Sequence, residues 1–126
     1  MCKLDDDRAI AVIEDDEGMR VSLDGLLRSL GYRTALFESA EAFLAAGADG
    51  PTLCVISDVA LPGGMSGLEL ARRLAQDRPE IPLILMSACA DQSCGREAKA
   101  LGVDALLAKP FDDEMLIGFL DRALVG

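Results

Sequence analysis

The chain contains no histidine and no tryptophan, and aromatic residues make up only 4% of its 126 residues. The lack of histidine excludes an imidazole catalyst, a phosphohistidine site and a His-rich metal site. Because aromatic residues are scarce, aliphatic side chains must fill the core, and the hydrophobic fraction of 51% is sufficient for that. A chain of this length fits one domain with a substantial core.

Basic residues are also few, since 12 lysines and arginines stand against 22 acidic residues and give a net charge of −10. Phosphate contacts need clustered lysine and arginine, so this balance argues against nucleic-acid binding by this domain. We interpret the acidity mainly as a contribution to solubility, with a smaller share from an acidic site that needs a cation.

Long apolar runs and paired cysteines are missing as well. No run approaches the roughly 20 residues of a membrane span, and residues 1–7 lack the apolar core of a signal peptide. The four cysteines form no C-x-x-C pair, and Cys54 lies in an apolar run that is typical of a core position. We therefore expect no membrane association, a cytoplasmic location and no disulfides.

Five apolar runs alternate with helical patterns along the chain. The predicted strands cover residues 9–13, 32–37, 53–56, 83–86 and 103–108. The first, third and fourth runs are apolar almost without interruption, which indicates strands covered by helices on both faces. We therefore predict an α/β domain with a doubly wound parallel sheet.

Capping residues mark the predicted helix boundaries. Ser39, Ser66 and Asp112 are typical N-caps, whereas Gly31 and Gly102 are typical of helix ends. We expect a fourth helix over residues 91–101 and a last helix with a buried face of Met115, Leu116, Phe119 and Leu120.

Polar residues follow four of the predicted strands at the point where each strand ends. They are Glu14-Asp15-Asp16, Asp58, Ser87 and Lys109-Pro110. Because the carboxyl ends of parallel strands meet at one edge of a sheet, we expect these side chains to surround one pocket. A pocket of carboxylates, a hydroxyl and an ammonium group suits a hard cation and a phosphoryl group.

The acidic residues have more than one interpretation. If the first and third strands are neighbours, Asp15 and Asp16 converge on Asp58, and a divalent cation relieves their repulsion. Oxygen ligands without histidine or thiolate favour Mg²⁺. The alternatives are helix capping for Asp15 and Asp16 and a turn for Asp58. We expect Glu14 to be a surface residue at the strand end.

Asp58 is also placed to act as a nucleophile toward phosphorus, forming an acyl phosphate. The charge on the transferred oxygens needs a cation, a lysine and hydrogen-bond donors, and Lys109 and Ser87 supply the last two. Taken singly, Ser87 is equally typical of a turn and Lys109 of a solvated surface. Their coincidence at matched strand ends carries the inference.

Five short segments occur in the order and spacing of one known family. They are Ile-Glu-Asp-Asp-Glu (13–17), Ser-Asp-Val-Ala-Leu-Pro (57–62), Met-Ser-Gly (65–67), Met-Ser-Ala (86–88) and Lys-Pro-Phe (109–111). Over essentially its whole length the chain resembles the receiver domains of two-component response regulators. The resemblance implies a single receiver domain over residues 1–126, with the (βα)5 flavodoxin-like fold and strand order 2-1-3-4-5.

The resemblance also implies a function for the acidic residues. Asp58 would accept phosphate from a histidine kinase or a histidine phosphotransfer protein. Mg²⁺ would be held by Asp16, Asp58 and the backbone carbonyl of Ala60, with Asp15 acting mainly through water.

By the same resemblance, Ser87 would bind a phosphoryl oxygen and Lys109 would attract it by charge. Phosphorylation would then shift an interaction surface formed by the fourth helix, the fifth strand and the fifth helix. The domain would be a signalling switch that catalyses only its own phosphorylation and slow dephosphorylation. A phosphorylation-dependent homodimer is left open.

Three positions depart from the usual pattern of that family. Leu106 stands where receivers usually carry an aromatic switch residue, and the loop at 62–65 has one residue more than the commonest form. Ala60 and Cys89 occupy positions that orient the hydrolytic water in some relatives, and neither side chain does this well. We therefore predict a long-lived phosphoryl state.

Two other classes of function compete with a phospho-accepting switch. A metal-dependent phosphatase would carry a second acid two residues after the nucleophile, and position 60 is alanine. A phosphorylation-independent interaction module would have lost the acidic pocket, which is present here. Within the leading hypothesis, a phosphorelay shuttle stays open, and neither the cognate kinase nor the output follows from the sequence.

Overall fold

Strands and helices alternate along the chain. The computed structural model describes residues 8–47, 52–61, 64–87, 96, 99–103, 105–109 and 112–125. The strands are β1 (Ala9–Ile13), β2 (Arg33–Phe37), β3 (Thr52–Asp58), β4 (Leu83–Ser87) and β5 (Ala105–Ala108), and the helices are α1 (Glu17–Ser29), α2 (Ala40–Gly47), α3 (Gly67–Asp77) and α5 (Asp113–Val125). The predicted fourth helix falls largely outside the described residues. None of the described helices is both long and apolar enough to cross a membrane.

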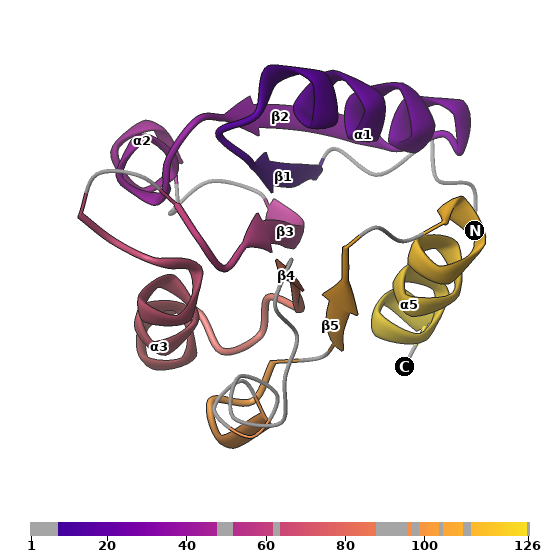
Figure 1. The fold of residues 1–126 in the computed structure, drawn as a ribbon. Helices are drawn as coiled ribbons and strands as arrows, with labels where there is room; N and C mark the ends of the chain where they lie inside the picture. The colour runs from indigo at the N-terminus through magenta and orange to yellow at the C-terminus, as the bar shows by residue number, and fades with distance from the viewer. Residues whose placement is uncertain are drawn as a thin grey trace.

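The five strands form one parallel sheet in the order β2-β1-β3-β4-β5, which confirms the predicted topology (Figure 1). The register places the carboxyl ends of the central strands side by side, because Ile13 pairs with Ser57 and Asp58 pairs with Met86. On the other side of β4, Ser87 pairs with Ala108. Residues at or just after these strand ends therefore meet at one edge.

Helices cover both faces of the sheet, as the continuous apolar runs predict (Figure 1). Alternate strand residues point to opposite faces, so Ala11 and Ile13 belong to one buried cluster and Ile10 and Val12 to the other. The first cluster packs against Phe43 of α2 and three residues of α3, namely Leu70, Ala71 and Leu74. The second packs against α1 and α5 through Leu23, Leu27, Leu116 and Leu120.

The predicted caps are confirmed by hydrogen bonds. Ser39, Ser66 and Asp112 each accept from the backbone N–H three residues later, at 3.0, 3.1 and 2.9 Å. Gly31 and Gly102 follow the ends of their helical segments with φ values of 94° and 79°, where a side chain would be strained.

Three details of the sequence prediction need correction. Met115 was predicted to be buried, but it is 46% exposed, while Leu116 and Leu120 of the same helix are fully buried. Phe119 is partly buried and packs against the same cluster, so the buried face of α5 runs through Leu116, Phe119 and Leu120 and leaves out Met115. β3 extends to Asp58 rather than ending at residue 56, and β5 begins at Ala105 rather than at residue 103.

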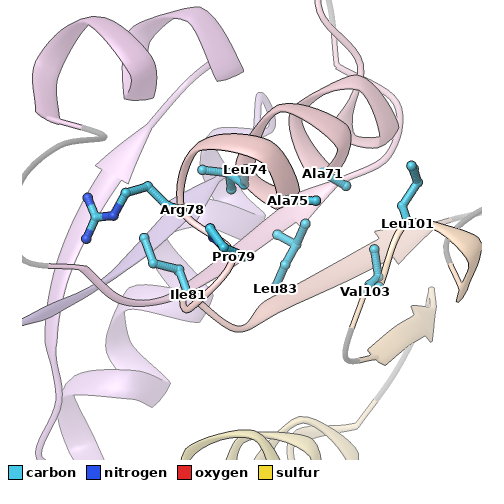
Figure 2. Close-up of a pocket in the computed structure, with 10 residues that line it drawn as sticks. Ala71, Leu74, Ala75, Arg78, Pro79, Ile81, Leu83, Leu101 and Val103 are labelled. Atoms are coloured by element: carbon cyan, nitrogen blue, oxygen red, sulfur yellow. The ribbon is translucent and has the colours of Figure 1, made fainter.

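At the amino ends of β4 and β5 the molecule has an apolar pocket of about 150 Å³ (Figure 2). The pocket lies between the last turns of α3 and the segment that leads into β5. Its lining includes Leu74, Ile81, Leu83, Leu101 and Val103, and the Arg78 side chain extends away from the apolar residues in this view.

Candidate functional site

The first residue after β1, Glu14, lies at the carboxyl edge of the sheet and is buried. Its exposed fraction is 1%, so the expectation of a surface residue is wrong. Its backbone is held on both sides, because its N–H donates to the Phe37 carbonyl at 3.0 Å and its carbonyl accepts from Arg20 Nη1 at 2.9 Å. These bonds direct the Glu14 side chain to a fixed place beside β3.

Asp58 lies next to Glu14 because Ile13 and Ser57, the residues before them, are paired across the sheet. Asp58 is 7% exposed. Its Oδ1 accepts the Ala60 backbone N–H at 3.1 Å, and the hydroxyl of Ser57 donates to its backbone carbonyl at 3.0 Å. The carboxylate is thus held at the sheet edge with part of its surface open.

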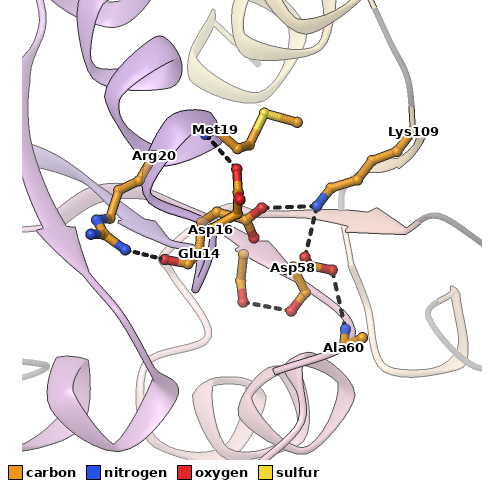
Figure 3. Close-up of polar contacts among 8 residues, drawn as sticks. Glu14, Asp16, Met19, Arg20, Asp58, Ala60 and Lys109 are labelled. Atoms are coloured by element: carbon orange, nitrogen blue, oxygen red, sulfur yellow. Dashed lines mark hydrogen bonds and ion pairs between the residues drawn. The ribbon is translucent and has the colours of Figure 1, made fainter. Parts of the chain in front are cut away.

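Lys109 joins the two carboxylates (Figure 3). Its Nζ lies 2.7 Å from Asp58 Oδ2 and 2.9 Å from Glu14 Oε1. The chain reaches this place because the Lys109 N–H donates to the Ser87 carbonyl at 2.8 Å, which continues the pairing of β4 and β5 for one residue. The prediction that Lys109 points into the pocket is confirmed, although Pro110 lies outside the described residues.

The charges of this cluster alter two pKa values. Burial raises the pKa of Glu14 to about 7, and the neighbouring Asp58 carboxylate adds to the rise while Lys109 opposes it. Burial alone would lower the pKa of Lys109, but the hydrogen bonds and charges of Asp58 and Glu14 outweigh it and raise this pKa above 10.5. At neutral pH the lysine is therefore charged.

A cation fits this cluster. Carboxylate oxygens of Glu14, Asp15 and Asp58 lie within 4.8 Å of one another. Among the described residues, the buried Glu14 Oε2 atom has no hydrogen-bond partner, and an orphaned buried acceptor is costly unless an ion or water meets it. The all-oxygen donor set is typical of a Mg²⁺ site.

Asp16 takes the helix-capping position, which was one of the two interpretations of the acidic pair. It is the N-cap of α1, and its carboxylate accepts the Met19 N–H at 2.8 Å (Figure 3). The capping alternative is thus confirmed for Asp16. Its role as a metal ligand stays a prediction, and the described acidic cluster contains Glu14 in its place.

Ser87 is the last residue of β4 and is 6% exposed. Its place beside the end of β5 agrees with the predicted rim of strand ends. Leu106 is partly buried and packs against the cluster formed with α2 and α3. Residues 88 and 89, which the sequence prediction also involved, lie outside the described residues.

Sequence reasoning missed Glu14 although a signal was present. Asp58 was selected because it ends a strand with an apolar run, and Glu14 directly follows another such run. The two strands are paired in register, so the same argument applied to β1 selects Glu14 first. The sequence prediction instead chose the adjacent pair Asp15 and Asp16 as metal ligands, one residue later than the cluster of Glu14 and Asp15 in the structure.

A flavodoxin-like sheet whose carboxyl edge holds two buried carboxylates and a charged lysine defines a domain suited to a cation and a phosphoryl group. The chain belongs to the response regulator receiver domain family, whose model matches residues 10–121. It is therefore a phospho-accepting receiver of two-component signal transduction.

The curated relatives include two bacterial transcription regulators. The chain is 39% identical to the transcriptional regulatory protein FixJ of Bradyrhizobium diazoefficiens, over 91% of this chain and 56% of that protein. It is 33% identical to the DNA-binding transcriptional regulator NtrC of Salmonella typhimurium, over 90% of this chain and 24% of NtrC. The chain thus spans about half the length of FixJ and a quarter of that of NtrC.

Solved receiver structures agree with this assignment. The crystal structure of FixJ-N matches with a TM-score of 0.83 and 33% identity, covering 94% of both chains. The BeF3-activated DrrB receiver domain matches with a TM-score of 0.85 and 30% identity, covering 94% of this chain and 98% of that one.

Proposed function

We propose that Asp58 is the phosphoacceptor and that its donor is the phosphohistidine of a histidine kinase or a histidine phosphotransfer protein. The observation that carries this proposal is the contact of Asp58 Oδ2 with Lys109 Nζ at 2.7 Å, at a carboxylate that remains partly open. In the transfer, a carboxylate oxygen forms a bond to phosphorus while the bond from phosphorus to the imidazole nitrogen breaks. The imidazole leaves with the bonding electron pair.

The groups around Asp58 would serve the transferred phosphoryl group. Lys109 contacts a carboxylate oxygen now, and its charge would then attract a phosphoryl oxygen. The Ser87 hydroxyl and the Ala60 N–H would donate hydrogen bonds to the same group. Lys109 and the Ala60 N–H already contact the Asp58 carboxylate in the free domain, which would lower the cost of reorganisation in the transfer.

Asp15, Asp58 and the Ala60 carbonyl would hold Mg²⁺, and the orphaned oxygen of Glu14 supports its inclusion in this set. When bound, the ion would neutralise the charge that accumulates on the carboxylate and phosphoryl oxygens. Asp16, which caps α1, would contribute through water.

The wider proposal retains the predictions from the sequence. Residues 1–126 would act as one receiver domain in the cytoplasm, with no catalysis beyond the domain's own phosphorylation and slow dephosphorylation. Phosphorylation would change a surface that includes β5 and α5, which a partner or a second copy of the domain would then bind.

The test is incubation with Mg²⁺ and acetyl phosphate, followed by intact mass spectrometry. The wild type is expected to gain one phosphoryl group, and Asp58→Asn is expected to gain none. Asp77→Asn is the matched control, because it makes the same change at an exposed aspartate of α3. A wild type without mass gain, or an Asp58→Asn variant with an equal gain, would contradict the proposal.

A further inference from the structure

The segment between β3 and α3, of which the structure describes residues 59–61 and 64–66, carries groups on which the proposed site depends. The Ala60 N–H donates to Asp58 Oδ1 at 3.1 Å, and the Ala60 carbonyl is a proposed metal ligand. The position of this segment therefore affects both the phosphoacceptor and the cation. What holds the segment in place is a question separate from the identity of the site.

The two ends of the segment are held by main-chain contacts. At its start, the Val59 N–H donates to the Met86 carbonyl at 2.8 Å, and at its end the Gly67 N–H donates to the Val59 carbonyl at 2.9 Å. Gly67 also packs so closely that an added Cβ would clash with the Asp58 carbonyl oxygen. Both ends are thus fixed against β3 and β4.

A side chain from a different element holds the segment near its second half. Glu41, in the first turn of α2, accepts the Met65 N–H with its Oε2 at 2.7 Å. The same oxygen lies 3.0 Å from where a Cβ of Gly64 would be. The carboxylate therefore lies directly against the backbone of the segment, and it joins residues that are 24 positions apart in the chain.

The contact is short and charge-assisted, although it lies at an exposed position. A carboxylate that accepts a backbone N–H forms a charge-assisted hydrogen bond, which is shorter and stronger than a neutral one. The Glu41 backbone is itself fixed, because the Ser39 cap holds the first turn of α2 through the Ala42 N–H at 3.0 Å. The neighbouring glycine gives the segment backbone freedom that such a contact restricts.

We propose that Glu41 is a positioning residue for the phosphoacceptor site. Its carboxylate ties the segment after β3 to α2 and so keeps Ala60 where its N–H meets Asp58 and its carbonyl meets the cation. The expected effect on phosphorylation rests on the proposed function. The hydrogen bond between Glu41 and Met65, by contrast, is present in the domain without metal or phosphate.

Three substitutions distinguish the effect of the hydrogen bond between Glu41 and Met65 from the effect of the Glu41 charge. Glu41→Gln keeps an acceptor oxygen at the same reach without the charge, whereas Glu41→Asp keeps the charge and loses one methylene of reach. Glu41→Ala removes both. Glu114→Ala is the matched control, because Glu114 is exposed and is also the second residue of its helix.

The first measurement is amide hydrogen exchange by NMR in metal-free protein, after thermal unfolding has shown that the variants are folded. Glu41→Ala and Glu41→Asp are expected to speed exchange of the Met65 amide by about tenfold, and to shift the Ala60 amide resonance. Glu41→Gln keeps an acceptor without the charge assistance and is expected to speed this exchange less, by about threefold. Glu114→Ala is expected to leave it unchanged. Unchanged Met65 exchange in Glu41→Ala would overturn the proposal.

The second measurement is the affinity for Mg²⁺ alone, by calorimetric titration. Glu41→Asp is expected to weaken binding several-fold, and Glu41→Gln is expected to weaken it less. The reverse order would show that Glu41 acts through its charge, and would overturn the proposal. Failure of the wild type to accept phosphate would refute the proposed function but would leave the Met65 exchange result intact.

Discussion

The carboxyl ends of β1 and β3 and the segment after β5 bring together Glu14, Asp58 and Lys109, whereas the amino ends of β4 and β5 border an apolar pocket. Both regions are built on the same sheet and the same buried strands. At the carboxyl end, charged side chains contact one another with little exposure. At the amino end, the partly buried Arg78 pairs with the exposed Glu80, with a nitrogen–oxygen distance of 2.6 Å. The comparison indicates that the residues at the carboxyl end of the sheet serve the proposed phosphorylation, whereas those at the amino end mainly contribute to stability.

The largest expected effect is on stability at the amino end. Leu74→Ala removes a side chain that is 3% exposed and lines the pocket, so the free energy of unfolding is expected to fall by about 3 kcal/mol. The phosphorylation rate below the unfolding transition is expected to stay unchanged. Urea unfolding measures the first and intact mass spectrometry the second.

The control for Leu74→Ala is Leu36→Ala, which makes the same change at a leucine that is 39% exposed. It is expected to cost less than about 1 kcal/mol. A loss of phosphorylation in folded Leu74→Ala would contradict the claim that the amino end of the sheet affects stability without affecting phosphorylation.

The next effect is on chemistry at the carboxyl end. Lys109→Ala removes the charge that contacts Asp58, so phosphorylation by acetyl phosphate is expected to slow on the order of 100-fold. Lys99→Ala, at an exposed lysine, is the control and is expected to leave the rate unchanged. Time courses of intact mass measure both rates, and equal rates for the two variants would contradict the role of Lys109.

A smaller effect concerns pH. The folded-state pKa of Glu14 is about 7 against an ordinary value of 4.5, so between these values the folded state holds a proton that the unfolded state has released. The free energy of unfolding contributed by this group therefore falls as pH rises through that range. Glu14→Gln is expected to remove this decline, by on the order of 2 kcal/mol between about pH 5 and about pH 8.

The measurement for Glu14 is urea unfolding of metal-free protein at both pH values. Glu38→Gln, at an exposed glutamate, is the control and should keep the wild-type pH dependence. If the free energy of unfolding of Glu14→Gln falls with pH as much as that of the wild type, Glu14 titrates as an ordinary solvated carboxyl group. That result would contradict a buried carboxylate at this position.

The smallest effect is expected on the solvent-exposed face of α3. Asp77 and Arg73 form an ion pair at 3.5 Å with both side chains more than half exposed. Asp77→Asn is expected to change the free energy of unfolding by less than about 0.5 kcal/mol. A larger loss by urea unfolding would show that charge also matters for packing away from the carboxyl edge.

Much of this comparison was predictable from the sequence. Continuous apolar runs predicted a sheet covered on both faces, and capping residues predicted where helices begin. Asp58, Ser87 and Lys109 were placed at one edge because parallel strands end together. These predictions depend on local patterns and on one rule of topology, which explains their success.

The failures concern how deep a side chain lies, which no local pattern determines. Glu14 is buried where β1 ends beside β3 and where Lys109 contacts its carboxylate, and these neighbours are far away in the chain. Met115 is exposed because the face of α5 that packs on the sheet runs through Leu116, Phe119 and Leu120. The bond from Glu41 to Met65 likewise joins distant segments, and no spacing in the sequence indicates it.

The central claim is that Asp58, held between Lys109 and the acidic cluster, is the phosphoacceptor. The most direct test is peptide mapping by mass spectrometry after incubation with acetyl phosphate, with and without Mg²⁺. The account predicts a single phosphorylated peptide that contains Asp58, formed only when Mg²⁺ is present. Phosphate on a different carboxylate, or equal labelling without Mg²⁺, would contradict it.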